Sequence, residues 1–304
     1  MGRFSKLILS LVAALPLVFL APSVSASALK AVLVTGSSTG IGRKITERLA
    51  ADGYFVYAGA RRTEDLEALS SIKNVQAVRL DVTRPADIEA AVETVTKAGR
   101  GLYGLVNNAG VFTLADIPGT KIEEFDLIMA VNVYGPWRMT RAFAPLIAAS
   151  KGRITNIGSI SGVISDPRAS AYDMSKHAIE AFTDSLAQEI APLGVRVSIV
   201  EPGSYNTEII NNVIRRAGQV PKTAGIPGLK EPDEVAEAVE RALSEPNPKR
   251  RYMVVPNAHQ AELTVKAQIR QLVQINEGQP YTFDRETLIK MLDEALAGAR
   301  PRTQ

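Results

Sequence analysis

Three residues in the middle of the chain could together perform acid–base chemistry on an oxygen atom. Tyr172 and Lys176 lie four residues apart, and Ser159 precedes Tyr172 by thirteen residues. Residues at positions i and i+4 share one face of a helix, so the lysine ammonium can lie beside the phenol. A nearby positive charge lowers the pKa of an acid by about 1–3 units, and the ordinary pKa of a phenol is about 10. The pair could then move a proton to a carbonyl or from a hydroxyl, while the serine holds that oxygen.

This spacing alone is weak, because a helical tyrosine and lysine more often mark a core edge and a solvated face. The interpretation depends on the elements that would position the three residues. Short apolar runs occur at 30–34, 55–59, 75–80, 103–106, 153–157, 195–200 and 251–255. Such runs, separated by helices, are typical of a parallel sheet covered on both faces. The sequence therefore predicts an α/β fold with a Rossmann-type, doubly wound parallel sheet of about seven strands.

Helical patterns separate the apolar runs and continue beyond the last one. They cover 40–52, 85–98, 121–149 with an interruption near Gly135-Pro136, 170–191, 259–275 and 284–297. The segment 218–232 is rich in glycine and proline and long for a connection, which predicts a mobile flap. We assign 29–304 to one domain, in which 257–304 form an extension on the substrate side.

The first apolar run leads into a glycine-rich turn between a strand and a helix. In such a turn the first glycine permits a sharp bend, and the second lets backbone N–H groups approach a pyrophosphate. The third glycine allows the helix and the strand to pack closely. This pattern predicts a dinucleotide-binding site with contacts from Gly36, Ser38, Gly40, Ile41 and Gly42.

The end of the second apolar run carries no acid that could bind a ribose diol. It carries Arg61 and Arg62 instead, and guanidinium groups have the geometry to hold a 2′-phosphate. Arg43, at the start of the first helix, could assist. Both arginines could alternatively be solvated loop residues. We expect NADP(H) rather than NAD(H) as the cofactor.

Composition excludes several other kinds of site. The chain has no cysteine, which rules out disulfides, thiolate chemistry and cysteine-ligated zinc. Its two histidines, His177 and His259, are far apart in the sequence, so no metal site is expected. Arg3 and Lys6 contribute two of the formal net charge of +3, so the rest of the chain carries about +1. A charge this small gives no argument for a nucleic-acid partner.

Residues 1–28 have the pattern of a targeting segment. Arg3 and Lys6 form a positive start, an apolar stretch follows, and Ala26-Ser27-Ala28 resembles a cleavage site. The apolar residues at 7–22 could instead remain as a membrane tether. Either the domain is membrane-associated and faces the cytoplasm, or it is exported after cleavage near Ala28. We favour the tether, because nicotinamide cofactors are scarce outside the cytoplasm.

Taken together, the motifs resemble those of the short-chain dehydrogenases/reductases in order and spacing. They are Thr35-Gly36-xxx-Gly40-Ile41-Gly42, Asn107-Asn108-Ala109-Gly110, Ser159, Tyr172-xxx-Lys176 and Pro202-Gly203. The resemblance covers about residues 30–256. The stretch from Val163 to Gly203 is most similar to the branch that contains hydroxysteroid and retinol dehydrogenases.

The resemblance implies a role for each matching residue. Tyr172 would be the general acid/base, and Ser159 would hydrogen-bond the reacting oxygen. Lys176 would bind the nicotinamide ribose and lower the pKa of the tyrosine, while Asn132 would hold a water in the proton relay. The implied cofactor contacts are Asp81 and Val82 at the adenine, Asn108, Ala109 and Gly110 at the sheet edge, and Pro202, Gly203 and Thr207 at the nicotinamide.

The expected activity is therefore the NADP(H)-dependent interconversion of an alcohol and a carbonyl compound. We expect an apolar substrate pocket, which favours a lipophilic substrate. The expected lining of this pocket is Val163, Ile164, Phe112, Leu114, Ile209 and Ile210. The resemblance also implies a homo-oligomer formed through the helices that carry Asn132 and Tyr172. The alternative function is a non-catalytic NADP-binding sensor tethered to a membrane.

Overall fold

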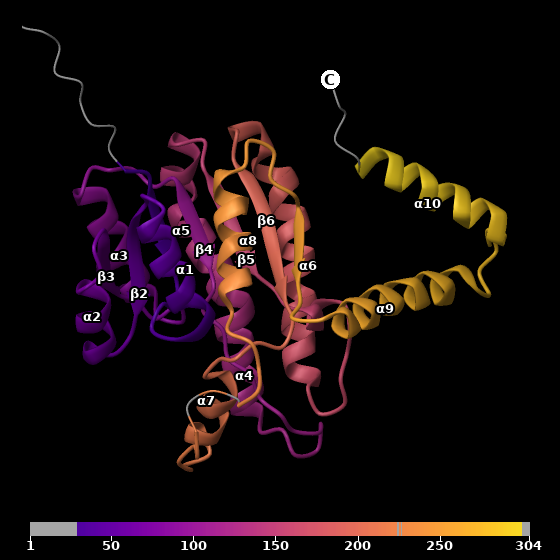
Figure 1. Cartoon of the computed structure of the whole chain (residues 1–304), viewed down its shortest axis with the longest axis horizontal. Helices are drawn as coiled ribbons and strands as arrows, with labels where there is room; N and C mark the ends of the chain where they lie inside the picture. Colours follow the sequence, from indigo (N-terminus) through magenta and orange to yellow (C-terminus); the bar gives the residue numbers. More distant parts are fainter. Residues whose placement is uncertain (1–28, 224, 226, 300–304) are drawn as a thin grey trace, which may run out of the picture.

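Seven strands form one parallel sheet in the order β3-β2-β1-β4-β5-β6-β7 (Figure 1). The computed structural model describes residues 29–223, 225 and 227–299. The strands are β1 (Ala31–Val34), β2 (Phe55–Ala60), β3 (Val75–Arg79), β4 (Gly104–Asn107), β5 (Arg153–Ile157), β6 (Arg196–Pro202) and β7 (Arg251–Val254). The strand order reverses between β1 and β4, which is where ligands bind in doubly wound sheets. The predicted sheet of about seven parallel strands is confirmed.

Helices cover both faces of this sheet. They are α1 (Gly40–Ala51), α2 (Thr63–Ser70), α3 (Pro85–Lys97), α4 (Ile122–Met129), α5 (Gly135–Ala149), α6 (Ser170–Ile190), α7 (Ile209–Arg216), α8 (Asp233–Ser244), α9 (Ala258–Asn276) and α10 (Arg285–Ala299). One core cluster joins the sheet to α3, α5 and α6, and Met139 and Phe143 lie fully buried in it. A second cluster joins the other face to α1 and α8 through Ile45, Leu49 and Val239. The two faces therefore have separate apolar cores.

Three helices were not specified from the sequence, namely α2, α7 and α8. The helix α7 lies in the loop after β6, just before the segment expected to be a flap. The predicted break near Gly135 is present in a particular form. A π-helical turn, Ala130–Tyr134, joins α4 to α5, and such turns are frequent at functional sites.

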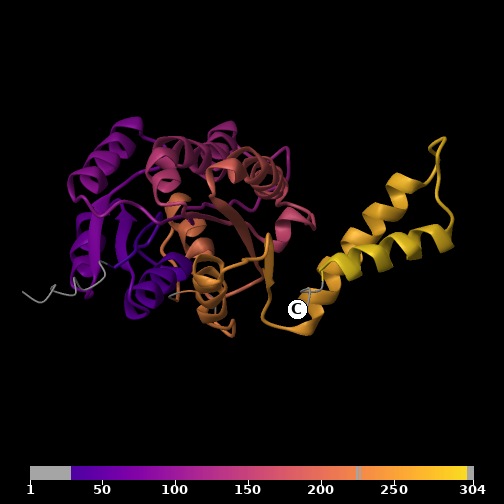
Figure 2. The ribbon, with the colours of Figure 1, turned by 90° about the horizontal axis from the view of Figure 1, so that it is seen from above.

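The C-terminal helices extend away from the sheet as an arm (Figures 1 and 2). Near its start α9 buries Thr264 and Ala267, and Ala267 packs against Ile160 and Ile164. The helix α10 begins at the outer end of the arm and runs back toward the body of the protein (Figure 2). Among the described helices, none is both long enough and apolar enough to span a membrane. The expectations for a tether at 7–22 and for cleavage near Ala28 concern residues outside the described ranges.

A buried polar network fixes α6 against the sheet. Asn107 on β4 donates through Nδ2 to Asn156 Oδ1 on β5 at 2.9 Å, and Asn156 Nδ2 donates to Thr183 Oγ1 on α6 at 2.8 Å. All three side chains are buried. Because buried amides must find partners, this network favours a single position of α6 along β5.

The substitution Asn156→Ala should destabilise the protein. It leaves the buried Asn107 amide with only Thr140 Oγ1, at 3.3 Å, as a side-chain acceptor and removes the donor to Thr183. An unsatisfied buried polar group costs about 1–3 kcal/mol. Urea unfolding measures the change in the free energy of unfolding. Gln188→Ala, on the exposed side of the same helix, is the control and should change little. Equal stability of the two variants would contradict a structural role for the network.

Candidate active site

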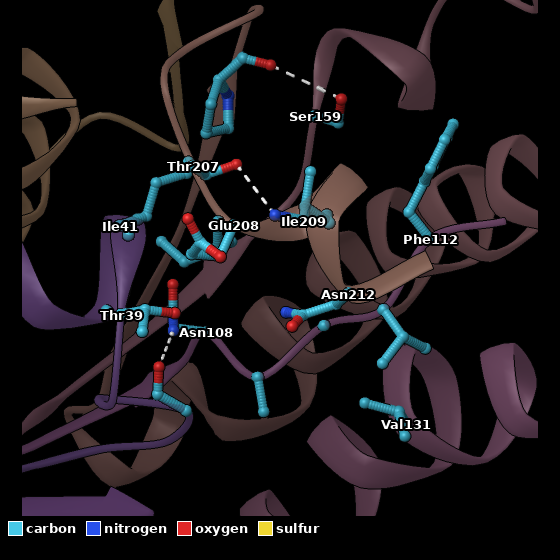
Figure 3. Close-up of a pocket in the computed structure, with 18 of the residues that line it drawn as sticks. Thr39, Ile41, Asn108, Phe112, Val131, Ser159, Thr207, Glu208, Ile209 and Asn212 are labelled. Carbon is cyan, nitrogen blue, oxygen red and sulfur yellow. Dashed lines mark hydrogen bonds between the residues drawn. The ribbon is translucent and has the colours of Figure 1, made fainter. Parts of the chain in front are cut away.

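A cavity of about 470 Å³ lies at the carboxyl ends of the strands. Figure 3 shows Thr39, Ile41 and Asn108 on one side of it, Phe112 and Val131 on another, and Thr207 to Ile209 between them. The predicted site residues that line it are Gly36, Ser38, Gly40, Ile41, Gly42, Arg61, Asp81, Val82, Asn108, Ala109, Gly110, Ser159, Tyr172, Lys176, Pro202, Gly203 and Thr207. The fold thus gathers residues from six strand ends into one space.

The glycine-rich turn is held by the segment that follows β4. Thr35 Oγ1 accepts hydrogen bonds from the N–H groups of Asn108 and Ala109 at 3.0 and 2.9 Å. In return, Asn108 Nδ2 donates to the carbonyl oxygens of Thr35 and Gly36 at 2.8 and 3.0 Å. The side chain of Asn108 is therefore used to hold the turn itself. These four hydrogen bonds give the turn a fixed shape at the start of α1.

The turn also meets the requirements of a phosphate-binding site. Gly36 and Gly40 have φ values of +68° and +55°, which glycine adopts without strain. A Cβ atom on Gly42 would lie 2.2 Å from the Gly36 carbonyl oxygen and 2.3 Å from Asn108 Nδ2, so only glycine fits there. The cavity opens beside the amino end of α1, where backbone N–H groups and the helix dipole favour an anion. These residues fit a dinucleotide pyrophosphate.

The two arginines after β2 have different surroundings. Arg61 lines the cavity, with its side chain 68% exposed and Nη1 3.9 Å from Asp81 Oδ2. Arg62 does not line the cavity, because its guanidinium makes two hydrogen bonds of 2.8 Å with Asp65 on α2. Arg43 likewise pairs with Glu47, at 2.6 Å, outside the cavity lining. In this structure Arg61 faces the cavity and Arg62 is paired with Asp65, and phosphate binding by either arginine stays a prediction.

Ser159, Tyr172 and Lys176 meet at the opposite end of the cavity. Lys176 Nζ donates to the carbonyl oxygen of Ile157 at 2.9 Å and lies 5.5 Å from the centroid of the Tyr172 ring. Ser159 Oγ accepts from the Ser161 N–H at 3.1 Å and donates to the Pro202 carbonyl oxygen at 3.5 Å. Phe112 packs edge-on against the tyrosine ring, with 4.8 Å between centroids. The strand end of β5 and one face of α6 thus bring the predicted trio together.

Burial dominates the ionisation of Tyr172 and Lys176. It raises the pKa of Tyr172 to about 12, against the opposing effect of the Ser159 hydroxyl. It also lowers the pKa of Lys176 to about 8, although the nearby Glu180 carboxyl acts to raise it. The expectation that the lysine would bring the phenol pKa below its ordinary value is therefore wrong for the described structure. The phenol is protonated at neutral pH and can act as an acid.

Asn132 lies behind the cavity wall in the π-helical turn. Its Oδ1 accepts from the Val111 N–H at 2.9 Å, and its Nδ2 donates to the Val111 carbonyl at 2.9 Å and to Ser175 Oγ at 3.0 Å. The side chain therefore ties the segment after β4 to α6. Its implied role in holding a water stays a prediction.

The predicted substrate pocket is partly correct. Phe112, Ile164, Ile209 and Ile210 line the cavity, whereas Val163 and Leu114 do not. Val163 instead packs in the cluster around Ala267 of α9, and Leu114 is largely exposed to solvent. These positions depend on how the loops turn, which the apolar character of the residues does not reveal.

The sequence does not indicate that α9 holds the loops after β5 and β6 beside the cavity. Gln260 Oε1 accepts from the Ser204 N–H at 2.9 Å, and Gln271 Nε2 donates to the Val163 carbonyl at 3.3 Å. No local pattern marks these glutamines. Glu180 and Glu201 were also not singled out, although their positions in the sequence point to them. Glu180 follows Lys176 by four residues on one helix, and Glu201 directly precedes Pro202.

Comparison with known proteins agrees with this geometry. The family model described as short chain dehydrogenase matches residues 30–217. The chain is 37% identical over 195 residues to the mitochondrial D-beta-hydroxybutyrate dehydrogenase of Bos taurus, which covers 61% of this chain and 57% of that enzyme. It is 38% identical over 186 residues to retinol dehydrogenase 5 of Mus musculus, which covers 59% of this chain and 58% of that enzyme. The matches to these two relatives thus span less than two thirds of their length.

A solved structure shows the same fold. The alcohol dehydrogenase of the archaeon Thermococcus sibiricus, complexed with 5-hydroxy-NADP, superposes with a TM-score of 0.66 at 28% identity. The match covers 75% of this chain and 95% of that one. With its parallel sheet, its glycine-rich turn and a family match over more than half its length, the chain belongs to the short-chain dehydrogenase family.

Proposed function

We propose that the protein is an NADP(H)-dependent oxidoreductase that interconverts a lipophilic alcohol and its carbonyl compound. The observation that carries the proposal is the meeting of Ser159, Tyr172 and Lys176 in the same cavity as the glycine-rich turn. The nicotinamide cofactor, when bound, supplies or accepts the hydride. The protein has to supply position and a proton.

Tyr172 is the proton donor in carbonyl reduction. Its pKa of about 12 means that it carries its proton at neutral pH, and Ser159 is placed to hydrogen-bond the same substrate oxygen. In the direction of alcohol oxidation the phenol must first lose its proton. Lys176 is the cation placed against its ring, at 5.5 Å from the centroid, to favour the charged form.

The cavity lining favours a lipophilic substrate over a hydroxy acid. Its apolar wall is formed by Phe112, Val131, Ile164, Ile209, Ile210 and Leu229. Among the described residues, Asp166 and Glu208 are the charged groups that line the cavity away from Arg61, Asp81 and Lys176. Glu208 is ion-paired with Arg215 at 2.7 Å, but the Asp166 carboxylate would repel a substrate carboxylate, as a hydroxy acid carries. A retinol-like or other apolar alcohol is then the better match.

The substitution Tyr172→Phe should abolish most turnover while leaving the fold intact. General acid–base catalysis contributes about 10²–10⁴-fold to a rate, so a loss of that size is expected. The assay follows NADPH oxidation with a panel of aliphatic and aromatic aldehydes and ketones of increasing chain length. NADPH binding, measured by fluorescence, should be unchanged in the variant.

Wild-type turnover in Tyr172→Phe would contradict the assignment of the proton donor. NADPH binding by the unmodified protein without turnover across the whole panel would favour the non-catalytic sensor instead.

The substitution Arg61→Ala should weaken NADPH binding more than NADH binding. Loss of a hydrogen bond to a charged group is worth about 1.5–3 kcal/mol, which corresponds to about tenfold or more in affinity. Arg62→Ala is the matched control, because Arg62 is held by Asp65 and should leave both affinities unchanged. An equal loss of affinity for NADPH and NADH in Arg61→Ala would show that this residue does not bind the 2′-phosphate.

A further inference from the structure

A buried pair of carboxyl groups lies behind the catalytic residues. Glu180 comes from α6, one helical turn after Lys176, and Glu201 comes from β6, directly before Pro202. Arg251 at the start of β7 contacts both, with Nε 3.1 Å from Glu180 Oε2 and 3.6 Å from Glu201 Oε1. The same guanidinium also binds Asp184 at 2.6 Å. One arginine thus faces three carboxyl groups.

The two inner carboxyl groups lie against the same cation. The side chains of Glu180 and Glu201 are 12% and 7% exposed, and Oε1 of each has no hydrogen-bond partner among the described residues. Burial raises the pKa of both groups, and the charge of Glu201 raises the pKa of Glu180 further. We therefore expect Glu180 to keep its proton to a higher pH than an exposed glutamate does.

Glu180 reaches the same strand end as Lys176. A Cβ atom on either Gly158 or Gly162 would lie 3.1 Å from Glu180 Oε1, and these two glycines flank Ser159. Lys176 Nζ binds the carbonyl of Ile157, the residue before Gly158. Both side chains project from α6 onto the end of β5, so their charges act on each other through a space that contains little water.

The charged groups around Glu180 come from three elements. Lys176 and Asp184 lie on its own helix, Glu201 lies on β6, Arg251 begins β7, and Arg250 directly precedes that strand. The segment 158–162 brings no titratable side chain. Of these groups, Glu180 is the one whose charge raises the pKa of Lys176. Because the two charges are opposite in sign, the loss of the Glu180 proton favours retention of the Lys176 proton.

We propose that Glu180 keeps Lys176 in its ammonium form at alkaline pH, and that Glu201 sets the pH range in which Glu180 acquires its charge. Glu180 is a positioning residue, since it acts on the reaction through Lys176. Its catalytic importance rests on the proposed function, but its effect on the lysine does not. The charge on Lys176 can be followed in the full chain without substrate or cofactor.

The test measures the titration midpoint of Lys176 by NMR of the full chain carrying ¹³Cε-labelled lysine, with Lys176→Arg identifying the signal. Glu180→Gln should move this midpoint to lower pH, because the supporting charge is lost. Glu201→Gln should leave it at or above the wild-type value, because Glu180 then ionises at lower pH. Glu189→Gln, an exposed position on the same helix, is the matched control and should have no effect.

The opposite behaviour of the two buried variants separates this role from simple packing. A midpoint that falls in both variants, or that moves in neither, would overturn the proposal. Where turnover is measurable, the alkaline limb of the kcat profile should follow the NMR midpoint in each variant. If the protein shows no turnover, the NMR titration still tests the effect of Glu180 on Lys176. Failure of the proposed function can therefore be distinguished from failure of this inference.

Discussion

A lysine ammonium held out of water is the constraint on which the rest of the site depends. Lys176 is 7% exposed, and its burial works against its charge. The carbonyl of Ile157 satisfies one of its N–H groups, which requires α6 to keep a fixed position along β5. The amide network of Asn107 and Asn156 with Thr183 provides that position two turns further along the helix. One strand therefore both anchors the helix and receives its lysine.

Much of this arrangement could be predicted from sequence, because its signals are local. Each strand is a short apolar run, and parallel strands that are buried on both faces have that appearance. Gly36 and Gly40 have positive φ values that favour glycine, and a Cβ atom on Gly42 would collide with the Gly36 carbonyl, so the three glycines mark the turn directly. Tyr172 and Lys176 were identifiable as a pair because a helix places residues four apart on one face. The N-terminal targeting pattern, the implied oligomer and the preference for NADP(H) stay predictions.

Other features depend on three-dimensional surroundings that no pattern encodes. Arg61 and Arg62 are adjacent and chemically identical, yet one lines the cavity and the other pairs with Asp65. The direction of the pKa shift of Tyr172 depends on burial, and a helical spacing says nothing about how much water reaches the phenol. Val163 packs against α9 because the C-terminal arm passes beside it, which could be seen only once the two segments were placed.

The contacts of α9 affect how the cavity could be engineered and how it could diverge within the family. The inner part of α9 contacts Ser204, which lines the cavity, through Gln260, while its outer part leaves the body of the protein and leads to α10 (Figure 2). Two glutamine contacts, those of Gln260 and Gln271, join it to loops from different strands. Grafting this helix from one relative onto another would therefore reshape the mouth of the cavity while leaving the proton-transfer residues in place.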